Sequence, residues 1–366
     1  MRVAIVDPAS FVLPYDLCLA QGLLVNGHTV ELYCSNSSYN GELLDQAAVA
    51  FTRQADRFLV RRFDISRTVS PRRLVGVWNY LRMLASLVRQ RRRFDAVCLQ
   101  FGIFLPLDLA FLWLMGRGVD LTVHDDVPHG FRGRRHWPTL LRCLSARRLV
   151  FTSEAVRRRF LNRYGLAFLE RRTTLLQHGT LAASMTEGER SEATSQDGGR
   201  AVTFFGTVKP YKGVDVLLAA APLLGGSRVE IYGRWDAELR PLAASAREQG
   251  IRVVDEFLSN EELDRLLRQE RVFVLPYRSA SQSGVLYLLL HYARPFVSTD
   301  QGDLGAFLRK HDLTDLIFDA DRPADLVRCI RLVLSNYEVL AERMRSIRKS
   351  YDWAAIVGSH PMFQEA

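Results

Sequence analysis

The chain has 366 residues, of which 48% are hydrophobic and 24% charged, so we expect a folded protein of about two domains and exclude a disordered or collagen-like chain. Its five cysteines form no CxxC pair and no cluster with histidine, which argues against a zinc site and a secreted disulfide framework and favours a reducing cytosol. The first residues show no signal-peptide pattern, so we expect a cytoplasmic location.

The net charge of +9 is unevenly distributed along the chain. Residues 1–180 contain 26 arginines, no lysine and 14 acidic residues, which gives a net charge of +12. Residues 181–366 contain 23 basic and 26 acidic residues. This asymmetry points to an anionic partner of the first half, such as a membrane surface. No nucleic-acid-binding module is recognisable, so we expect no nucleic-acid partner.

In the first half, short apolar runs alternate with helical patterns. We predict strands at residues 2–7, 29–33, 96–100, 121–124, 149–152 and 174–177, and a first helix at residues 15–25. Because these runs are bounded by turn residues and separated by helical patterns, they predict a parallel sheet covered on both faces.

Two segments of the first half are strongly apolar. Residues 101–115 are too few to span a bilayer and contain Pro106 and Asp108, so we expect a buried helix. Residues 71–93 are predicted to form a long helix with arginines crowded at its ends. Apolar residues recur along it at helical spacing: Leu74, Val77, Leu81, Leu84 and Val88. It is either a core-facing helix with solvated ends or an interfacial element that touches anionic lipid.

The second half repeats the alternation, with strands predicted at residues 201–205, 228–232, 271–275 and 295–299 and helices at 214–224 and 261–268. We therefore predict an α/β protein with two doubly wound, Rossmann-like domains facing across a cleft. The expected boundaries are residues 1–184 for the first domain and 201–345 for the second. Residues 185–200 would form a flexible linker, and 346–366 a C-terminal segment that could cross back to the first domain.

Candidate ligand-binding residues follow the strands of the second half, because open parallel sheets bind ligands beyond the carboxyl ends of their strands. Residues 206–213 hold Lys209 and Lys212, two of only four lysines, between bounding glycines. Glycine lets the backbone approach a ligand closely, and lysine supplies positive charge for a diphosphate. A solvated turn remains the alternative.

A second candidate segment is Ser-Gln-Ser-Gly at residues 281–284, which precedes a strongly apolar helix. Ser281 or Ser283 could be the N-cap of that helix. The free amides of Ser283, Gly284 and Val285, together with the helix dipole, would suit a phosphate. A plainly capped core helix explains the same pattern equally well.

In the first half, two histidines and two aspartates follow a predicted strand: His124, Asp125, Asp126 and His129. Such a group could hold a proton acceptor or bind substrate hydroxyls. Four ligands from one turn are crowded for a metal, so we expect none. His178 and Gly179 follow another strand and could line the same cleft. A structural turn and an ordinary loop histidine remain the alternatives.

Taken together, these segments resemble the GT-B fold nucleotide-sugar glycosyltransferases of the family 4-like type. The stretch FFGTVKPYKGVDVLLAA, which starts at Phe204, is similar to the family segment F-G-x-x-x-x-x-K-G-x-D-x-L-L-x-A. IYGR, VVDEFLSNEELDRLL, VFVLPYR and SGVLYLLLHYARPFVSTDQGDL follow in family order. The first half matches more loosely, through NGHTVELY, LTVHDDVPH and TLLQHG.

The resemblance implies a hexosyltransferase that moves a sugar from a UDP- or GDP-sugar to a hydroxyl of a saccharide acceptor, with no metal or other cofactor and with retention. The expected acceptor is a lipid-linked saccharide of cell-surface polysaccharide synthesis, and the expected location is the inner face of the cell membrane, as a peripheral protein. The first domain would bind the acceptor and the second the nucleotide sugar.

The resemblance and the strand-end positions together give the candidate site. The catalytic candidates are His124, Asp125, Lys209 and Lys212. The donor-binding candidates are Gly206, Thr207, Lys209, Lys212, Gly233, Arg234, Glu256, Phe257, Ser281, Gln282, Ser283, Gly284 and Val285. The acceptor-side candidates are Tyr15, Asp16, His129 and His178.

The sequence departs from the family pattern in three places. Thr207 stands where the family usually has arginine. Residues 280–290 contain neither of two family glutamates spaced eight apart, and Ser281, Gln282 and Ser283 could replace them as neutral hydrogen-bond partners. The first strand-to-helix loop, DPASFVLPYD, lacks the usual glycine pair. A sugar-nucleotide epimerase of the same fold and a non-catalytic partner subunit therefore remain alternatives.

Overall fold

The structure, a computed structural model, describes residues 1–35, 41–65, 73–116, 118–127, 131, 133, 135–185, 200–280 and 282–364. The chain divides into two compact units. Unit 1 comprises Met1–Gly179 together with Tyr351–Ala366, and unit 2 comprises Thr180–Ser350. The divisions thus fall at 179/180 and 350/351, where the sequence analysis placed them at 184 and 346. Of the expected linker, residues 186–199 lie outside the described residues.

Unit 1 is built on seven parallel strands in the order β3-β2-β1-β4-β5-β6-β7. The strands are β1 (Arg2–Asp7), β2 (Thr29–Ser35), β3 (Phe58–Phe63), β4 (Ala96–Leu99), β5 (Val119–Val123), β6 (Arg148–Phe151) and β7 (Thr173–Leu175). Val3 of β1 pairs with Val30 on one side and Ala96 on the other. The strand order therefore reverses at β1 and β4, which is where such sheets bind ligands.

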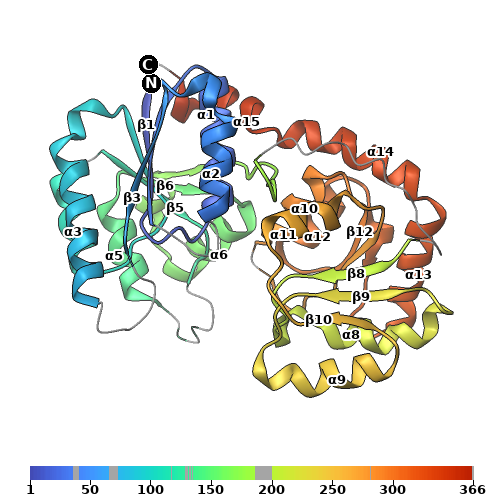
Figure 1. The fold of residues 1–366 in the computed structure, drawn as a ribbon. Coiled ribbons are helices and arrows are strands. Elements are labelled where there is room, and N and C mark those ends of the chain that lie inside the picture. Colours follow the sequence, from blue (N-terminus) through green and yellow to red (C-terminus); the bar gives the residue numbers. More distant parts are fainter. Residues whose placement is uncertain are drawn as a thin grey trace. The chain divides into compact units, whose positions relative to one another are not determined.

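Helices cover both faces of this sheet (Figure 1). They are α1 (Leu13–Val25), α2 (Gly41–Ala50), α3 (Arg73–Arg89), α4 (Leu105–Leu114), α5 (Trp137–Ser145), α6 (Glu154–Tyr164), α7 (Ala167–Glu170) and α15 (Trp353–Ser359). Figure 1 shows α1 and α2 on one side of the sheet and α3 and α5 on the other. The inward sides of α3, α4, α5 and α6 share one apolar core with the strands. From β3 to β7 the chain crosses the sheet in one direction, so right-handed crossovers place these helices on the same face.

The helix α15 returns the C-terminal segment to unit 1 by packing on α1. A Cβ on Gly22 of α1 would lie 2.7 Å from the backbone oxygen of Trp353, and a Cβ on Gly179 would lie 2.6 Å from the indole ring. Real Cβ contacts are not this short, so both positions require glycine for Trp353 to fit. Gly22 and Gly179, which are far apart in the sequence, thus form the surface on which Trp353 of α15 packs.

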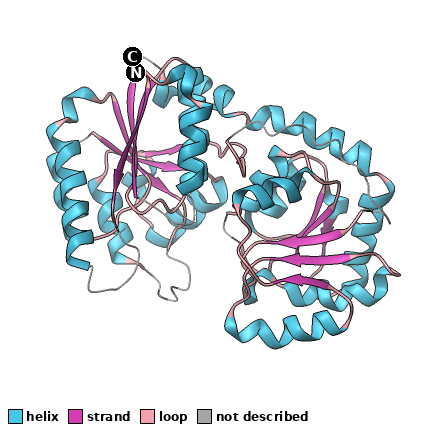
Figure 2. Cartoon of the chain, viewed as in Figure 1, coloured by secondary structure: helices cyan, strands magenta, loops and turns pink. Residues whose placement is uncertain are grey.

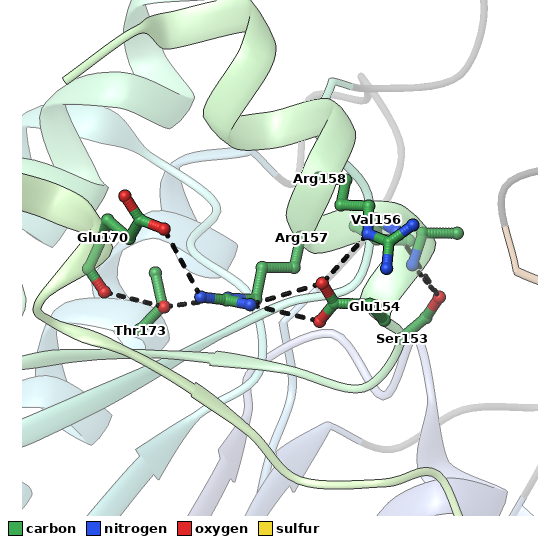
Figure 3. A network of polar contacts seen from close by, with 8 residues as sticks. Ser153, Glu154, Val156, Arg157, Arg158, Glu170 and Thr173 are labelled. Atoms are coloured by element: carbon green, nitrogen blue, oxygen red, sulfur yellow. Dashed lines mark hydrogen bonds and ion pairs between the residues drawn. The ribbon is translucent and has the colours of Figure 1, made fainter. Parts of the chain in front are cut away.

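A polar network holds the start of α6 against the end of the sheet (Figure 3). The hydroxyl of Ser153 accepts hydrogen bonds from the first-turn amides of α6, as an N-cap should. Glu154 pairs with Arg157 and Arg158 one turn later. The Arg157 guanidinium also donates to the Thr173 hydroxyl of β7, at 3.0 Å. This network fixes the connection from α6 to β7.

Unit 2 is built on six parallel strands in the order β10-β9-β8-β11-β12-β13. The strands are β8 (Val202–Phe205), β9 (Val229–Tyr232), β10 (Arg252–Val254), β11 (Val272–Leu275), β12 (Phe296–Thr299) and β13 (Ile317–Phe318). The helices are α8 (Val214–Ala220), α9 (Arg240–Glu248), α10 (Asn260–Arg268), α11 (Gly284–His291), α12 (Gly302–Lys310), α13 (Pro323–Ser335) and α14 (Tyr337–Arg348). Here the strand order reverses between β8 and β11.

The predicted fold class is confirmed: each unit is a parallel α/β layer structure of the Rossmann-like type (Figure 2). The expectation of a buried helix at residues 101–115 is correct for the helix and wrong for its burial, because in α4 only Asp108, Phe111 and Leu112 are buried. None of the helices that the structure describes is long and apolar enough to cross a bilayer.

The expected core face of the 71–93 helix is wrong for three of its five residues. Leu74, Val77 and Leu81 are exposed, whereas Leu84 is buried in the core and Val88 packs against it. The other side chains that reach the core from α3 are Tyr80, Met83 and Leu87.

Candidate functional site

The strand order of the unit 2 sheet reverses between β8 and β11, and we call this position the switch point. The predicted donor-side segments gather around it. Residues 206–213 follow β8, residues 233–234 follow β9 and residues 276–285 follow β11. All three start at carboxyl ends of neighbouring parallel strands, so they meet at one edge of the sheet.

Two glycines bring the ends of β8 and β9 unusually close together. Gly206 and Gly233 have φ of 110° and 135°, which L-residues with side chains rarely adopt. A Cβ on Gly233 would lie 2.1 Å from the carbonyl oxygen of Gly206. The Gly206 amide donates to the Tyr232 carbonyl at 2.9 Å. Only glycine fits at residue 233, and the sheet edge there is bare backbone that a ligand can approach.

A third glycine folds the segment after β8 back onto β11. Gly213 has φ of 63°, and a Cβ there would lie 2.0 Å from the carbonyl oxygen of Pro276. The Arg278 amide also donates to the Tyr211 carbonyl at 2.7 Å. The segment therefore closes over the switch point itself.

Lys212, the last residue of the 3₁₀ turn Pro210–Lys212, points into this bare edge. Its ammonium nitrogen lies 3.2 Å from the position of a Cβ on Gly206 and 5.2 Å from the ring centroid of Tyr277. No aspartate or glutamate among the described residues pairs with it. Burial lowers the pKa of Lys212. A bound anion would offset this desolvation, because it favours the charged form.

The other three cations of this region, Lys209, Arg234 and Arg278, are placed differently. Lys209, the N-cap of the same turn, is exposed, and Thr207 is partly buried. The Arg278 guanidinium lies 2.5 Å from the Asp215 carboxylate, so its charge is already paired. Lys212 is thus the cation of this edge that is both withdrawn from water and unpaired within the described part of unit 2.

The helix α11 begins at the same edge. Ser283 is its N-cap and is buried, but its side chain accepts no hydrogen bond from the helix amides. The first-turn amides of Gly284 and Val285 therefore keep their donor capacity. Burial raises the pKa of Tyr277, and the nearby Ser283 hydroxyl lowers that pKa by a smaller amount. Tyr277 thus lies beside both Lys212 and the start of α11.

The remaining donor-side candidates spread along this edge. Arg234 stacks over Phe257, with 5.6 Å from its guanidinium carbon to the ring centroid, and both residues are exposed. Glu256 is also exposed, Gln282 is partly buried, and Ser281 lies outside the described residues. A cavity of about 490 Å³ opens at the ends of β11, β12 and β13, and Tyr277 and Asp300 are among its lining residues.

In unit 1, the candidates from distant segments form a group of rings. The Tyr15 ring centroid lies 5.4 Å from that of His124, 5.0 Å from that of His178 and 5.1 Å from that of Trp353. His124 stacks on Phe101, with centroids 4.9 Å apart. The predicted residues Tyr15, His124 and His178 are therefore brought together near the ends of β4 and β5.

Both histidines of this group are neutral at neutral pH. Burial lowers the pKa of His124 to about 4 and that of His178 to about 3. The Gln100 side-chain oxygen lies 2.9 Å from His124 Nε2, and the Gly179 carbonyl lies 2.6 Å from His178 Nδ1. These acceptors place the ring protons and leave a lone pair on His124 Nδ1 and on His178 Nε2.

The unit 1 candidates differ in their exposure to solvent. Tyr15, Asp16 and His178 are buried, whereas His124 and Asp125 are partly exposed. Asp126 is committed to Arg163 of α6, at 2.7 Å. His129 lies outside the described residues.

Asp16 is withdrawn from solvent altogether. Burial, and then the neighbouring Asp7, raise the pKa of Asp16 well above its usual range. Because Asp16 is fully buried, it does not contact an acceptor directly in this conformation.

Sequence comparison identifies the family. A model described as "Glycosyl transferases group 1" matches residues 199–336, and one described as "Glycosyltransferase Family 4" matches residues 17–179. The chain belongs to the group 1 glycosyltransferases. No protein of curated function matches the sequence of this glycosyltransferase.

Solved structures resemble this glycosyltransferase over nearly its whole length. Sucrose-phosphate synthase from Thermosynechococcus elongatus superposes with a TM-score of 0.68 at 13% identity, covering 97% of this chain and 96% of its own. Anabaena HepE, solved with UDP and glucose, gives 0.67 at 14% identity, with 97% of each chain covered. WaaG, a glycosyltransferase of lipopolysaccharide biosynthesis, gives 0.61 at 13% identity, again with 97% of each covered. At such identities the likeness establishes the shared GT-B fold.

Some residues of the glycosyltransferase site escaped sequence reasoning. Gln100 and Phe101 directly follow β4, so the strand-end rule used elsewhere could have found them. Trp353 could not be found in this way, because it arrives from the C-terminal segment, far away in sequence.

Proposed function

We propose that the protein is a retaining hexosyltransferase that moves a sugar from a UDP- or GDP-sugar to a hydroxyl of a lipid-linked saccharide, without a metal ion, at the cytoplasmic face of an anionic membrane. The observation that carries the proposal is Lys212, which is partly buried on the glycine-built edge of the unit 2 sheet and forms no ion pair with a described residue. The solved HepE structure, which holds UDP and glucose, makes UDP-glucose the first donor to test.

The proposed chemistry is mainly electrostatic. Departure of a nucleoside diphosphate concentrates negative charge on its phosphates in the transition state. Lys212, with the first-turn amides of α11, would stabilise that charge, because both are held in position by the fold before the reaction starts. The exposed Arg234–Phe257 stack offers a surface for the base.

On the acceptor side, we assign His124 to the reacting sugar and Asp125 to orientation. His124 is neutral and partly exposed, and its Nδ1 lone pair can accept a hydrogen bond from a hydroxyl. Tyr15, which packs edge-on against both His124 and His178, would hold the His124 ring in place. Lys209, exposed beside Lys212, would contact the outer phosphate.

The test is a thermal-shift measurement with UDP, GDP, ADP, dTDP and their common sugar conjugates, with and without EDTA. A ligand at 100 times its Kd should stabilise the fold by about 2.7 kcal/mol. We expect a clear shift with one nucleotide that EDTA does not change. A shift that EDTA abolishes would contradict the metal-free site.

The absence of glutamate from residues 280–290 favours one other candidate, a non-catalytic partner subunit. That candidate predicts no shift with any nucleotide. It also predicts no release of nucleotide from a sugar donor when acceptor is present, so the two functions give opposite results in the same assay.

A further inference from the structure

The outward side of one helical layer of unit 1 is strongly apolar. Three helices form this layer, α3, α4 and α5, and their opposite sides fill the core. The carboxylate of Asp108 on α4 accepts hydrogen bonds from Tyr80 of α3 and, at 2.7 Å, from Arg142 of α5. α3 also contacts α4, and α4 contacts α5, so the three helices lie side by side and their outward sides adjoin.

This surface carries every exposed tryptophan of the described residues. Trp78 of α3 is 59% exposed, Trp113 of α4 80% and Trp137 of α5 58%. The other two tryptophans of the chain, Trp235 and Trp353, are buried. We call this surface the tryptophan face and define it by its exposed apolar residues: Leu74, Trp78, Leu81, Trp113, Leu114, Trp137 and Leu141.

Polar groups are missing where a solvent-facing helix would have them. The exposed residues of α4 are Pro106, Ala110, Trp113 and Leu114, and its one charged residue, Asp108, is buried. On α3, Leu74, Trp78 and Leu81 recur at helical spacing on the outward side, with Leu74 82% exposed. Soluble proteins rarely leave so large an apolar surface without a partner.

Positive charge is concentrated in the segments that carry the tryptophan face. The sequence from residue 65 to 94 contains eight arginines and no acidic residue, and that from 127 to 153 contains six arginines and none. Five arginines in α3 and just beyond its end are exposed and form no ion pair with a described residue: Arg82, Arg89, Arg91, Arg92 and Arg93. The exposed arginines therefore belong to the same helix as Leu74, Trp78 and Leu81, or follow directly after it.

We infer that the tryptophan face docks unit 1 onto an anionic phospholipid bilayer, with the tryptophans at headgroup depth and the arginines against the lipid phosphates. Tryptophan favours the membrane–water interface, and basic residues at its border add electrostatic attraction. The inference rests on the membrane association in the proposed function and assigns it to particular residues.

A second copy of the chain fits this face less well than lipid does. A two-fold interface would bring the same surface of two molecules together, and so set these arginines against their own copies. Like charges placed opposite one another oppose such an association. An anionic bilayer matches both the charge and the apolar surface.

The test compares binding of the full chain to vesicles of phosphatidylglycerol and phosphatidylcholine with binding to phosphatidylcholine alone, by sedimentation at low salt. The variant is Trp78→Ser/Trp113→Ser/Trp137→Ser. The matched control is Val25→Ser/Val49→Ser/Val339→Ser, which removes exposed apolar side chains outside the tryptophan face. Sedimentation velocity without lipid reports the oligomeric state of all three proteins.

We expect the wild type and the control to bind anionic vesicles at least ten times better than neutral ones, with a blue shift of tryptophan emission. The triple variant should lose roughly tenfold in binding, and each arginine removed should cost about fivefold. Equal binding to both vesicle types, or unchanged binding of the triple variant, would overturn the inference. So would a wild-type dimer that the triple variant converts to monomer without any lipid binding.

The nucleotide thermal shift, measured on the same proteins, separates this inference from the proposed function. The triple variant should keep the wild-type response, because none of its substitutions lies in unit 2. Vesicle binding by a wild type that responds to no nucleotide would contradict the proposed function and leave the docking face standing.

Discussion

The ammonium nitrogen of Lys212 lies 3.2 Å from the point at which Gly206 would carry a Cβ. A side chain at residue 206 would therefore compete with the lysine for the same space. The bare glycine, together with a cation that no acidic residue pairs in the part of the chain that the structure describes, leaves room for an anionic group at the switch point of the unit 2 sheet.

The close approach of Gly206 and Gly233 predicts a large effect of Gly233→Ala. The new Cβ would lie 2.1 Å from the Gly206 carbonyl oxygen at a φ of 135°, so we expect a loss of about 3 kcal/mol or more in the free energy of unfolding. Gly250→Ala, at positive φ but with open space around it, should cost about 1 kcal/mol. Urea unfolding of both variants checks this, and equal losses would contradict the clash.

Asp16→Asn should stabilise the protein at alkaline pH. Burial, and then Asp7, raise the pKa of Asp16, so the folded state binds a proton that the unfolded state releases above about pH 3.9. The wild type therefore loses stability as the pH rises above that value towards the raised pKa, and an amide removes this cost. We expect a gain of about 2 kcal/mol at pH 8 and less at pH 4.

The control for that prediction is Asp56→Asn, at an exposed carboxyl. It should change the free energy of unfolding by less than about 0.5 kcal/mol at either pH. A destabilised Asp16→Asn at pH 8 would show instead that the Asp16 carboxylate is charged in the folded protein.

The two buried histidines of unit 1 predict a loss of stability in acid. The pKa of His124 is about 4 and that of His178 about 3, whereas an unfolded histidine titrates near 6.5. Between these values the unfolded state binds more protons, so the free energy of unfolding falls as the pH drops from about 6.5 towards 4. Melting temperatures at pH 7.5 and pH 5 test this.

His124→Gln should weaken that dependence on pH without abolishing it. The burial of His291 in unit 2 lowers its pKa to about 4 as well, so part of the acid sensitivity remains in the variant. If the melting temperature of the variant falls between pH 7.5 and pH 5 as steeply as that of the wild type, His124 does not contribute to the acid sensitivity.

The sequence predicted the frame of the fold because its strands are short, apolar and bounded by turn residues. The run RVAIVD at residues 2–7 became β1 with the predicted bounds. The strand β3 was missed, since FLVRRF mixes arginine into its run and is only partly buried at a sheet edge. An edge strand lacks the continuous apolar run of a central one.

Periodicity alone could not tell which side of α3 faces the core. The helix has two apolar stripes, one through Leu74, Trp78 and Leu81 and one through Tyr80, Leu84 and Leu87. The second packs in the core and the first is exposed. Periodicity assumes that the apolar side is the inner one, and it fails where a helix keeps a second apolar side outward.

Sequence reasoning found the part of the candidate site that lies within one segment of the chain. It did not find the part that is built from several distant segments. Glycines and lysines between a strand and a helix identified residues 206–213. The ring group around Tyr15 joins Phe101, His124, His178 and Trp353, which come from four separate segments. Only the sheet order and the return of α15 bring these rings together.

The central claim is that Lys212 stabilises the leaving diphosphate of a nucleotide sugar, and donor turnover by Lys212→Ala tests it most directly. The measurement is steady-state release of nucleotide from the donor found by thermal shift, in EDTA, with Lys310→Ala of α12 as the control. We predict a loss of about a hundredfold in kcat for Lys212→Ala, a small loss for the exposed Lys209→Ala, and wild-type turnover for the control. Wild-type kcat in Lys212→Ala would contradict the account.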